Sequence, residues 1–388
     1  DKAPWSELNV KRCIVKDGVK NIGNYAFAGC TGLTEIKLPD AIQGIGKNAF
    51  ADCTGLTEIE LPNAITGIEE NAFAGCTGLT EIKLPNAITG IEESVFEGCT
   101  GLTEIEIPGS VTEINNRAFA DCTLLRTVGC SENITEIGEE AFKGCAALEA
   151  FVVPHGVTEI KTGTFDGCAL TEVQLPSALK IIGSRAFAGN KFTEVEIPAS
   201  VTSIDQQAFT ECEQLEKYVV DTESRSYSSS SGFLYNRVGT TLLSCPEGKA
   251  GVITISTKVK TIGDYAFRDC KKITELNLPP TLTTIGRYAF TNMTLYEIEI
   301  PPYVTSIGQY AFKDCMQLVA INADEESETF TSEKGILCNK EKTNVEICPP
   351  GLKEVTLWEG ITGINAGTFT GMVEGTVIDL PFSLESIS

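Results

Sequence analysis

A repeat of 23 residues is the feature of this sequence that most constrains its fold. Seven Phe residues recur at this step, each followed three positions later by Cys: Phe27, Phe50, Phe73, Phe96, Phe119, Phe142 and Phe165. The Phe position continues at Phe187 and Phe209, at Phe267, Phe290 and Phe312, and at Phe369. A chain of 388 residues would otherwise suggest two or three globular domains. Thirteen copies of one short pattern instead predict a repeat solenoid.

Each repeat opens with a short strand. In one copy, Leu33, Ile36 and Leu38 form an apolar set, while Glu35 and Lys37 alternate with them. Successive side chains of a strand point to opposite faces, so the charged pair is expected on the outer face of a sheet. One repeat cannot bury its apolar side alone, whereas stacked repeats can.

The rest of the repeat returns the chain to the next strand. Pro39 is expected to end the strand because it cannot donate to a neighbouring ladder. Ile42 and Ile45 suit a bend or a short return strand, and residues 48–53 suggest one helical or 3₁₀ turn. Phe50 is expected to supply the bulk of the core.

Sixteen strands are expected on one curved parallel sheet. They start at residues 10, 33, 56, 79, 102, 125, 148, 170, 192, 215, 250, 273, 295, 318, 352 and 375. The strand pattern Leu-x-x-Ile-x-Leu and the period are typical of leucine-rich repeats. The predicted fold class is therefore a leucine-rich-repeat solenoid, a β-rich horseshoe with short return strands, continuous over 1–388. Trp5 and Leu8 are expected to help cover its first repeat.

The repeat also resembles a known family. The run AFAGCTGLTEIKLPNAITGIEENAF is similar to the BspA-like, Treponema-type leucine-rich repeats of bacterial and protist surface proteins, and the likeness extends from about Val10 to Ser388. The resemblance implies the same fold and a cell-surface or secreted protein, with adhesion to host matrix proteins in some members. It implies no fixed functional residues.

Two inserts, 221–249 and 324–351, interrupt the period. They match each other, since Gly232-Phe233-Leu234-Tyr235 corresponds to Gly335-Ile336-Leu337-Cys338. Each reads as strand, turn, strand, which predicts β-hairpins at the return side or edge of the solenoid. The Ser-rich segment 224–231 is expected to form a mobile tip, with a binding loop as the alternative.

Composition excludes several functions. The net charge of −23 argues against nucleic-acid binding through phosphates. His155 is the only His, so no zinc site with two His ligands exists and any His-dependent nucleophile would have to use it; it is expected in an exposed loop. No apolar run is long enough for a membrane span. Both ends resemble cut ends, and the C-terminal end is expected to be truncated.

The cysteines form a ladder rather than a site. Ten of the thirteen positions after Phe are Cys, while Asn190, Met293 and Met372 occupy the others. A metal cluster would not tolerate those replacements, and disulfide geometry is demanding for stacked side chains. We therefore expect buried structural thiols, with Cys13 and Cys130 also in the core and disulfides or metal as the alternatives. No cofactor, metal ion or catalytic residue is expected.

A column of Glu residues is the best functional candidate. It occupies the outward strand positions, which line the concave and usual binding side in leucine-rich repeats. The candidate partner-binding residues are Glu35, Glu58, Glu60, Glu81, Glu104, Glu106, Glu172, Glu194, Glu196, Glu275, Glu297 and Glu299. The alternative is a solvated face that only prevents association of sheets.

Two function classes follow from these patterns. The first is a non-enzymatic cell-surface or extracellular protein that binds a protein or glycan partner, including a basic one, through an acidic concave face. The second is a structural spacer that displays another domain and has no ligand in this segment. No nucleic-acid partner and no direct membrane insertion are expected. The oligomeric state is left open.

Overall fold

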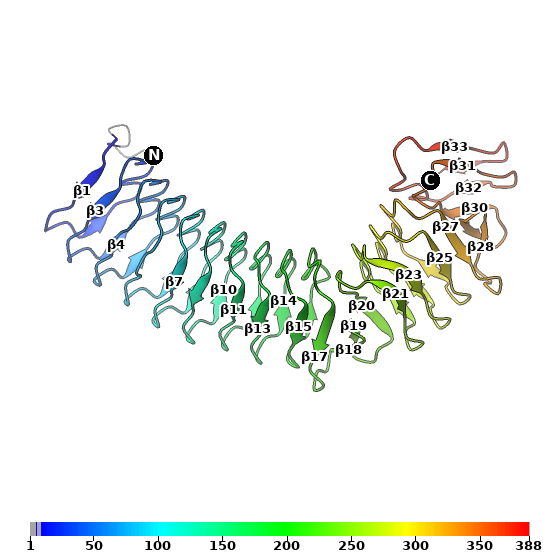
Figure 1. Ribbon diagram of the computed structural model, residues 1–388, viewed down its shortest axis with the longest axis horizontal. Coiled ribbons are helices and arrows are strands. Elements are labelled where there is room, and N and C mark those ends of the chain that lie inside the picture. Colours follow the sequence, from blue (N-terminus) through cyan, green and yellow to red (C-terminus); the bar gives the residue numbers. More distant parts are fainter. Residues whose placement is uncertain (1–4, 6–8, 388) are drawn as a thin grey trace. The chain divides into compact units, whose positions relative to one another are not determined.

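The computed structural model describes residue 5 and residues 9–387, and none of these residues lies in a helix. The chain divides into two compact units, Asp1–Cys212 and Glu213–Ser388. Each unit is a stack of similar rungs (Figure 1). The continuity of the solenoid over 1–388 stays a prediction.

In the first unit, each rung has a strand-face segment and a return strand. The strands of the strand face are β1 (Arg12–Ile14), β3 (Glu35–Lys37), β7 (Glu104–Glu106), β9 (Thr127–Gly129), β11 (Ala150–Val152), β13 (Glu172–Gln174) and β15 (Glu194–Ile197). The return strands are β2 (Asn21–Ile22), β4 (Gly44–Ile45), β5 (Gly67–Ile68), β6 (Gly90–Ile91), β8 (Glu113–Ile114), β10 (Glu136–Ile137), β12 (Glu159–Ile160), β14 (Ile181–Ile182) and β16 (Ser203–Ile204). The described pairings join strands of the same set and are parallel and in register, as in Ile22 with Ile45.

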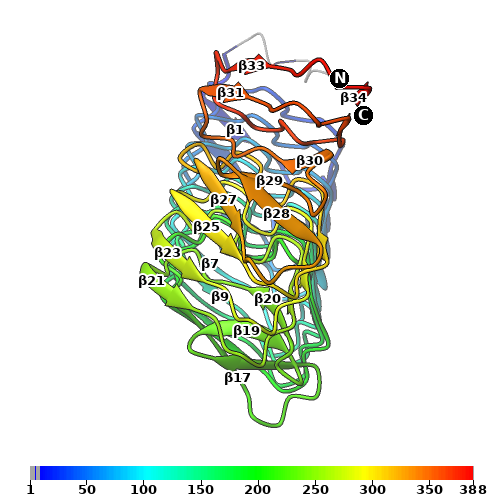
Figure 2. The ribbon, with the colours of Figure 1, turned by 90° about the vertical axis from the view of Figure 1, so that its right-hand side faces the viewer.

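The second unit follows the same plan. Its strand face holds β17 (Lys217–Val220), β21 (Gly251–Thr254), β23 (Ile273–Asn277), β25 (Glu297–Ile300), β27 (Ala320–Ala323), β31 (Glu354–Thr356) and β33 (Val377–Asp379). Its return strands are β22 (Thr261–Ile262), β24 (Thr284–Ile285), β26 (Ser306–Ile307), β32 (Gly363–Ile364) and β34 (Ser386–Ile387). Figure 2 shows β21, β23, β25, β27, β31 and β33 along one side of this unit and the return strand β34 on the other.

The two inserts fold as antiparallel strands that join the return side. The first consists of β18 (Tyr227–Ser230), β19 (Phe233–Asn236) and β20 (Thr241–Ser244), and the second of β28 (Phe330–Glu333), β29 (Ile336–Asn339) and β30 (Asn344–Ile347). Strand β20 pairs with β22, and β30 pairs with β32. The expectation of a mobile Ser-rich tip is wrong, because Tyr227–Ser230 is a strand paired to β19.

A column of stacked Phe rings fills the core of the first unit. Neighbouring rings from Phe27 to Phe209 have centroids 5.2 to 5.7 Å apart and lie within 12° of parallel. Trp5 packs on the first of them at 5.5 Å, whereas Leu8 lies outside the described residues. The rung spacing thus lets each Phe contact the next, which buries a continuous apolar column.

The segment predicted as one helical turn is not helical. Residues 48–53 contain successive turns, in which alternate N–H groups bond to the next rung and the others bond to carbonyls three residues back. Phe50 N–H donates to the carbonyl of Ala72 at 2.8 Å, and Asp52 N–H donates to that of Ala74 at 2.7 Å. The stack of repeats therefore satisfies the backbone that a helix would satisfy locally.

The thiol ladder is structural. Buried Cys Sγ atoms donate to the carbonyl of the Phe in the preceding rung, at 3.1 Å for Cys99 with Phe73 and for Cys122 with Phe96. Asn190 replaces one thiol, and its Nδ2 donates to Phe165 at 2.8 Å. All fifteen cysteines are free thiols. Cys13 and Cys130 differ from the prediction, since they are only half-buried.

Candidate functional site

The predicted Glu residues all lie on the strand face, alternating with buried side chains. Glu35 and Glu194 are half-buried, and the other ten are exposed. The alternation is clear in β7, where buried Ile105 separates exposed Glu104 and Glu106. These carboxylates are therefore available to solvent and to partners.

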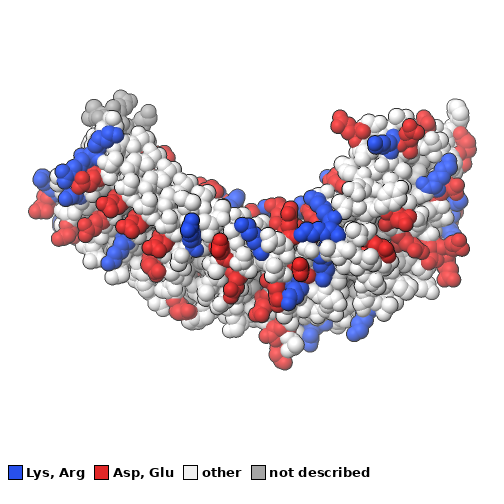
Figure 3. Space-filling model, in the orientation of Figure 1, with Lys and Arg blue, Asp and Glu red and all other residues white. Residues whose placement is uncertain are grey.

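Four consecutive rungs bring six of them together around one hollow. We call it the acidic hollow; its volume is about 610 Å³, and its walls are Glu35, Ile36, Lys37, Glu58, Ile59, Glu60, Glu81, Ile82, Lys83, Glu104, Ile105 and Glu106. The six carboxylates stand around the hollow with Lys37 and Lys83 between them, while the four Ile side chains of its lining are buried in the core. Figure 3 shows acidic side chains recurring along the part of the surface that Figure 1 colours blue to green.

The hollow coincides with an opening in the strand ladder. Residues 58–60 and 81–83 have the sequence of the neighbouring strands but form no strand in the structure. The return side of the same rungs stays paired, as Ile45 with Ile68 shows. Thus the rungs remain stacked without a strand ladder here, and Thr80 N–H still donates to the carbonyl of Thr57 at 3.1 Å.

Like charge accounts for some openings in the ladder but not for all of them, because β9 and β11 also form no ladder although Thr127 and Ala150 are neutral. In the described pairs of the strand face, each column Glu faces a residue that is not acidic, as Glu104 faces Thr127 and Glu297 faces Ala320. No ladder forms where Glu58 and Glu81 would face each other. Like charges directly opposite in a sheet are destabilising, so repulsion along the column opposes these ladders.

On the return side, one pair of facing Glu residues does form a ladder. Glu113 and Glu136 face each other in the pair β8–β10 and the ladder nevertheless forms. There, however, Lys161 forms an ion pair with Glu136 and so reduces the repulsion.

Few cations neutralise the acidic hollow. Glu35 is held by Arg12, with Nε to Oε2 at 2.9 Å, and lies 3.8 Å from the Nζ of Lys37. Among the described residues no ion pair or hydrogen bond engages the other five carboxylates, those of Glu58, Glu60, Glu81, Glu104 and Glu106. Sequence analysis missed Arg12, although its register with Glu35 could have revealed it.

The other predicted residues are not part of this hollow. Glu172 accepts a hydrogen bond from Gln174 at 3.4 Å, and Glu275 accepts one from Asn277 at 3.0 Å. Glu194 and Glu196 lie on β15, beyond the break made by Ala150 and Val152. In the second unit, Glu297 and Glu299 lie on β25. The apolar interruptions therefore confine the densest acidic cluster to the four rungs between Glu35 and Glu106.

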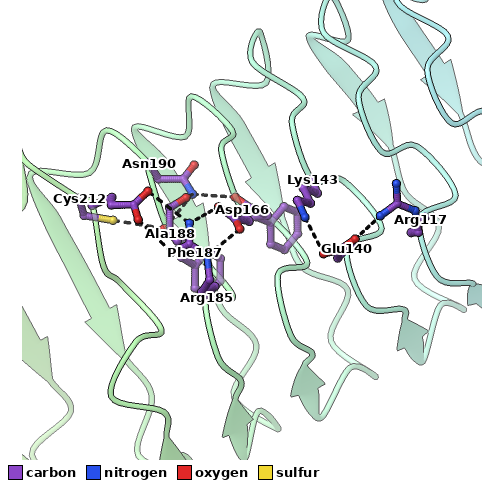
Figure 4. A network of polar contacts seen from close by, with 11 residues as sticks. Arg117, Glu140, Lys143, Asp166, Arg185, Phe187, Ala188, Asn190 and Cys212 are labelled. Atoms are coloured by element: carbon purple, nitrogen blue, oxygen red, sulfur yellow. Dashed lines mark hydrogen bonds and ion pairs between the residues drawn. The ribbon is translucent and has the colours of Figure 1, made fainter.

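The turns carry a second set of charges, but these are paired. Arg117 bonds to Glu97 at 2.5 Å and also contacts Glu140, while Arg185 bonds to Asp166 at 2.9 Å (Figure 4). The Arg117 guanidinium lowers the pKa of Glu97 below its usual range. These networks link neighbouring rungs and leave little free charge for a ligand.

The remaining sequence candidates have structural environments. His155 is exposed, as expected, and its Nδ1 contacts the carboxylate of Glu132. The described residues contain no group of three or more His, Cys, Asp or Glu side chains arranged to hold a metal ion. Within the same residues, no helix is long and apolar enough to cross a membrane.

Comparison with known proteins gives a consistent result. The model of the family described as "BspA type Leucine rich repeat region (6 copies)" matches residues 3–126, 135–240 and 247–349. A leucine-rich repeat protein from Bacteroides ovatus is 28% identical, with a TM-score of 0.66 and 82% of each chain covered. A leucine rich cell surface protein from Faecalibacterium prausnitzii is 25% identical, with a TM-score of 0.58, covering 96% of this chain and 88% of that one. No curated protein matches the chain.

Proposed function

This chain belongs to the BspA-type leucine-rich-repeat family, and on that premise we propose that it is a cell-surface or extracellular binding protein without enzymatic activity. One of the similar solved structures is itself described as a cell surface protein. The observation that carries the proposal is the acidic hollow, in which five exposed carboxylates have no partner among the described residues.

The exposed carboxylates of the acidic hollow favour a basic protein segment as the partner. Exposed Glu side chains raise the local concentration of cationic groups and steer their approach. Because the backbone of residues 58–60 and 81–83 is outside any ladder, it can also bond to a partner. An adhesive role on protein or glycan would use this same surface.

The test is a binding screen with matched variants. The purified chain is screened against extracellular-matrix glycoproteins and a glycan array at low and physiological salt. For any saturable ligand, the triple variant Glu58→Gln, Glu81→Gln, Glu104→Gln is expected to bind about tenfold more weakly, a loss of about 1.4 kcal/mol. Its binding should also depend less on salt.

The control variant removes the same charge from the other side of the rungs. Glu69→Gln, Glu113→Gln and Glu159→Gln change exposed residues at or beside the return strands, and this triple should bind like the parent chain. If both triple variants lost the same amount of binding affinity, the effect would come from net charge alone. That result would overturn the assignment to the acidic hollow. A blank screen would favour the alternative, a spacer that displays another domain.

A further inference from the structure

A second hollow lies in the second unit, beside the insert 324–351. We call it the notch; its volume is about 480 Å³. One wall is the rung 305–313, and the others come from the insert and from the turn 365–370. Its size lies within the range of roughly 300–1,000 Å³ that is typical of small-ligand sites.

Regular rungs of this unit join their turns through backbone hydrogen bonds. Tyr288 N–H donates to the carbonyl of Gln309 at 3.3 Å, and Phe290 N–H donates to that of Ala311 at 2.8 Å. Asn292 N–H continues the series by donating to the carbonyl of Lys313 at 2.9 Å, so each turn offers three donors, spaced two residues apart, to the rung that follows it.

The return strands offer acceptors in the same direction. The carbonyl of Thr283 accepts from Thr305 N–H at 3.0 Å, and that of Ile285 accepts from Gly308 N–H at 2.8 Å. The backbone of a rung is therefore fully paired on this side when the next rung supplies two N–H groups and then three carbonyls.

The rung 305–313 has no such successor. Strand β26 is the last strand of its sheet, because the insert strands β28, β29 and β30 form a separate sheet with β32. Among the described residues, the N–H groups of Tyr310 and Phe312 find no acceptor, and the carbonyls of Thr305 and Ile307 find no donor. All four residues line the notch, so the unpaired backbone groups face one shared space.

The side chains around these groups are mainly apolar or neutral. Ile307, Phe312, Phe330 and Ile347 line the notch, together with several Thr residues. At the turn end, Gly367 lies against the ring of Tyr310, where an added Cβ would sit 3.3 Å from Cε1. The notch is thus bridged at that end, and an entering group must approach from the return side.

We propose that the notch binds a short extended peptide of a partner protein, which takes the place of the missing rung. Two peptide N–H groups donate to the carbonyls of Thr305 and Ile307, and two peptide carbonyls accept from Tyr310 and Phe312. A β-branched or aromatic side chain of the peptide packs against Phe312 and Phe330. Adding a strand in this way derives affinity from main-chain bonds and specificity from side-chain pockets.

This site is independent of the acidic hollow. A peptide with the sequence of one of the chain's own regular rungs can serve as the probe. Residues 283–292, TTIGRYAFTN, form the turn side of a regular rung and have the required alternation of donors and acceptors. A fluorescently labelled peptide of this sequence is expected to bind the full chain saturably. The peptide in which the residue corresponding to Phe290 is Ala should bind at least tenfold more weakly.

Matched chain variants locate the binding. Gln309 is exposed at the notch, and Arg287 is exposed at the equivalent position of the preceding rung. Gln309→Trp should obstruct the notch and weaken peptide binding at least tenfold, whereas Arg287→Trp should leave it unchanged. Thermal melting of both variants checks that they are folded.

Three results would overturn the proposal. The peptide fails to saturate, it binds Gln309→Trp as tightly as the parent chain, or a scrambled peptide binds equally well. The Glu58, Glu81, Glu104 triple should bind the peptide normally, so this site and the proposed function can fail separately.

Discussion

Raising the pH from 7 to 10 is expected to destabilise the first unit by roughly 5 kcal/mol, through the thiol ladder. Burial raises the pKa of the Cys76, Cys99, Cys122 and Cys145 thiols well above the ordinary value of 9.0. The folded chain therefore keeps these protons while the unfolded chain loses them. The stabilisation is complete below pH 9 and falls as the pH rises past it, by about 1.4 kcal/mol per thiol at pH 10.

The measurement is thermal unfolding between pH 7 and pH 10 under reducing conditions. A loss of 5 kcal/mol corresponds to a fall in Tm of roughly 10–20 °C for a unit of this size. The control replaces the four Cys residues with Ser, which keeps a donor for the Phe carbonyls and does not ionise in this range. An equally steep fall in that variant would assign the pH dependence to other groups.

Replacing Phe96 with Ala is expected to destabilise the first unit by about 3–5 kcal/mol. The Phe96 ring is fully buried and stacks on Phe73 at 5.7 Å and on Phe119 at 5.4 Å. Truncation leaves a cavity in the centre of the column, where neighbouring rungs are held by their own hydrogen bonds and cannot close it.

Urea unfolding followed by circular dichroism measures the effect. The control is Leu124→Ala in the same unit, because Leu124 is 47% exposed and its loss should change the free energy of unfolding by about 0.5 kcal/mol or less. Similar losses in the two variants would mean that the Phe column does not hold the rungs together.

The repeat made most of the fold predictable. Its period placed the Phe column and the return strands, and the alternation of Glu35, Ile36 and Lys37 gave the correct exposed face. The helical turn at 48–53 was wrong because that interpretation counted only local bonds. Half of the N–H groups in this segment have their partners one rung away, where sequence position gives no direct signal.

The candidate site was only partly predictable. The Glu column could be read from the sequence, but the same Leu-Thr-Glu-Ile pattern forms a strand at 104–106 and none at 58–60. The difference depends on the neighbouring rung, since Glu104 faces Thr127 whereas Glu58 lies between two other Glu rungs. The notch could not be predicted for a similar reason. It forms because the insert provides no backbone acceptors for the N–H groups of Tyr310 and Phe312.

Amide hydrogen exchange, with and without a macromolecule captured in the screen, tests the central claim most directly. In the free chain, residues 58–60 and 81–83 lie outside any ladder and should exchange faster than β3 and β7 on either side. If the acidic hollow is the binding surface, the partner should slow exchange in these two segments more than elsewhere in the first unit. Slowed exchange elsewhere, with these segments unchanged, would contradict the assignment.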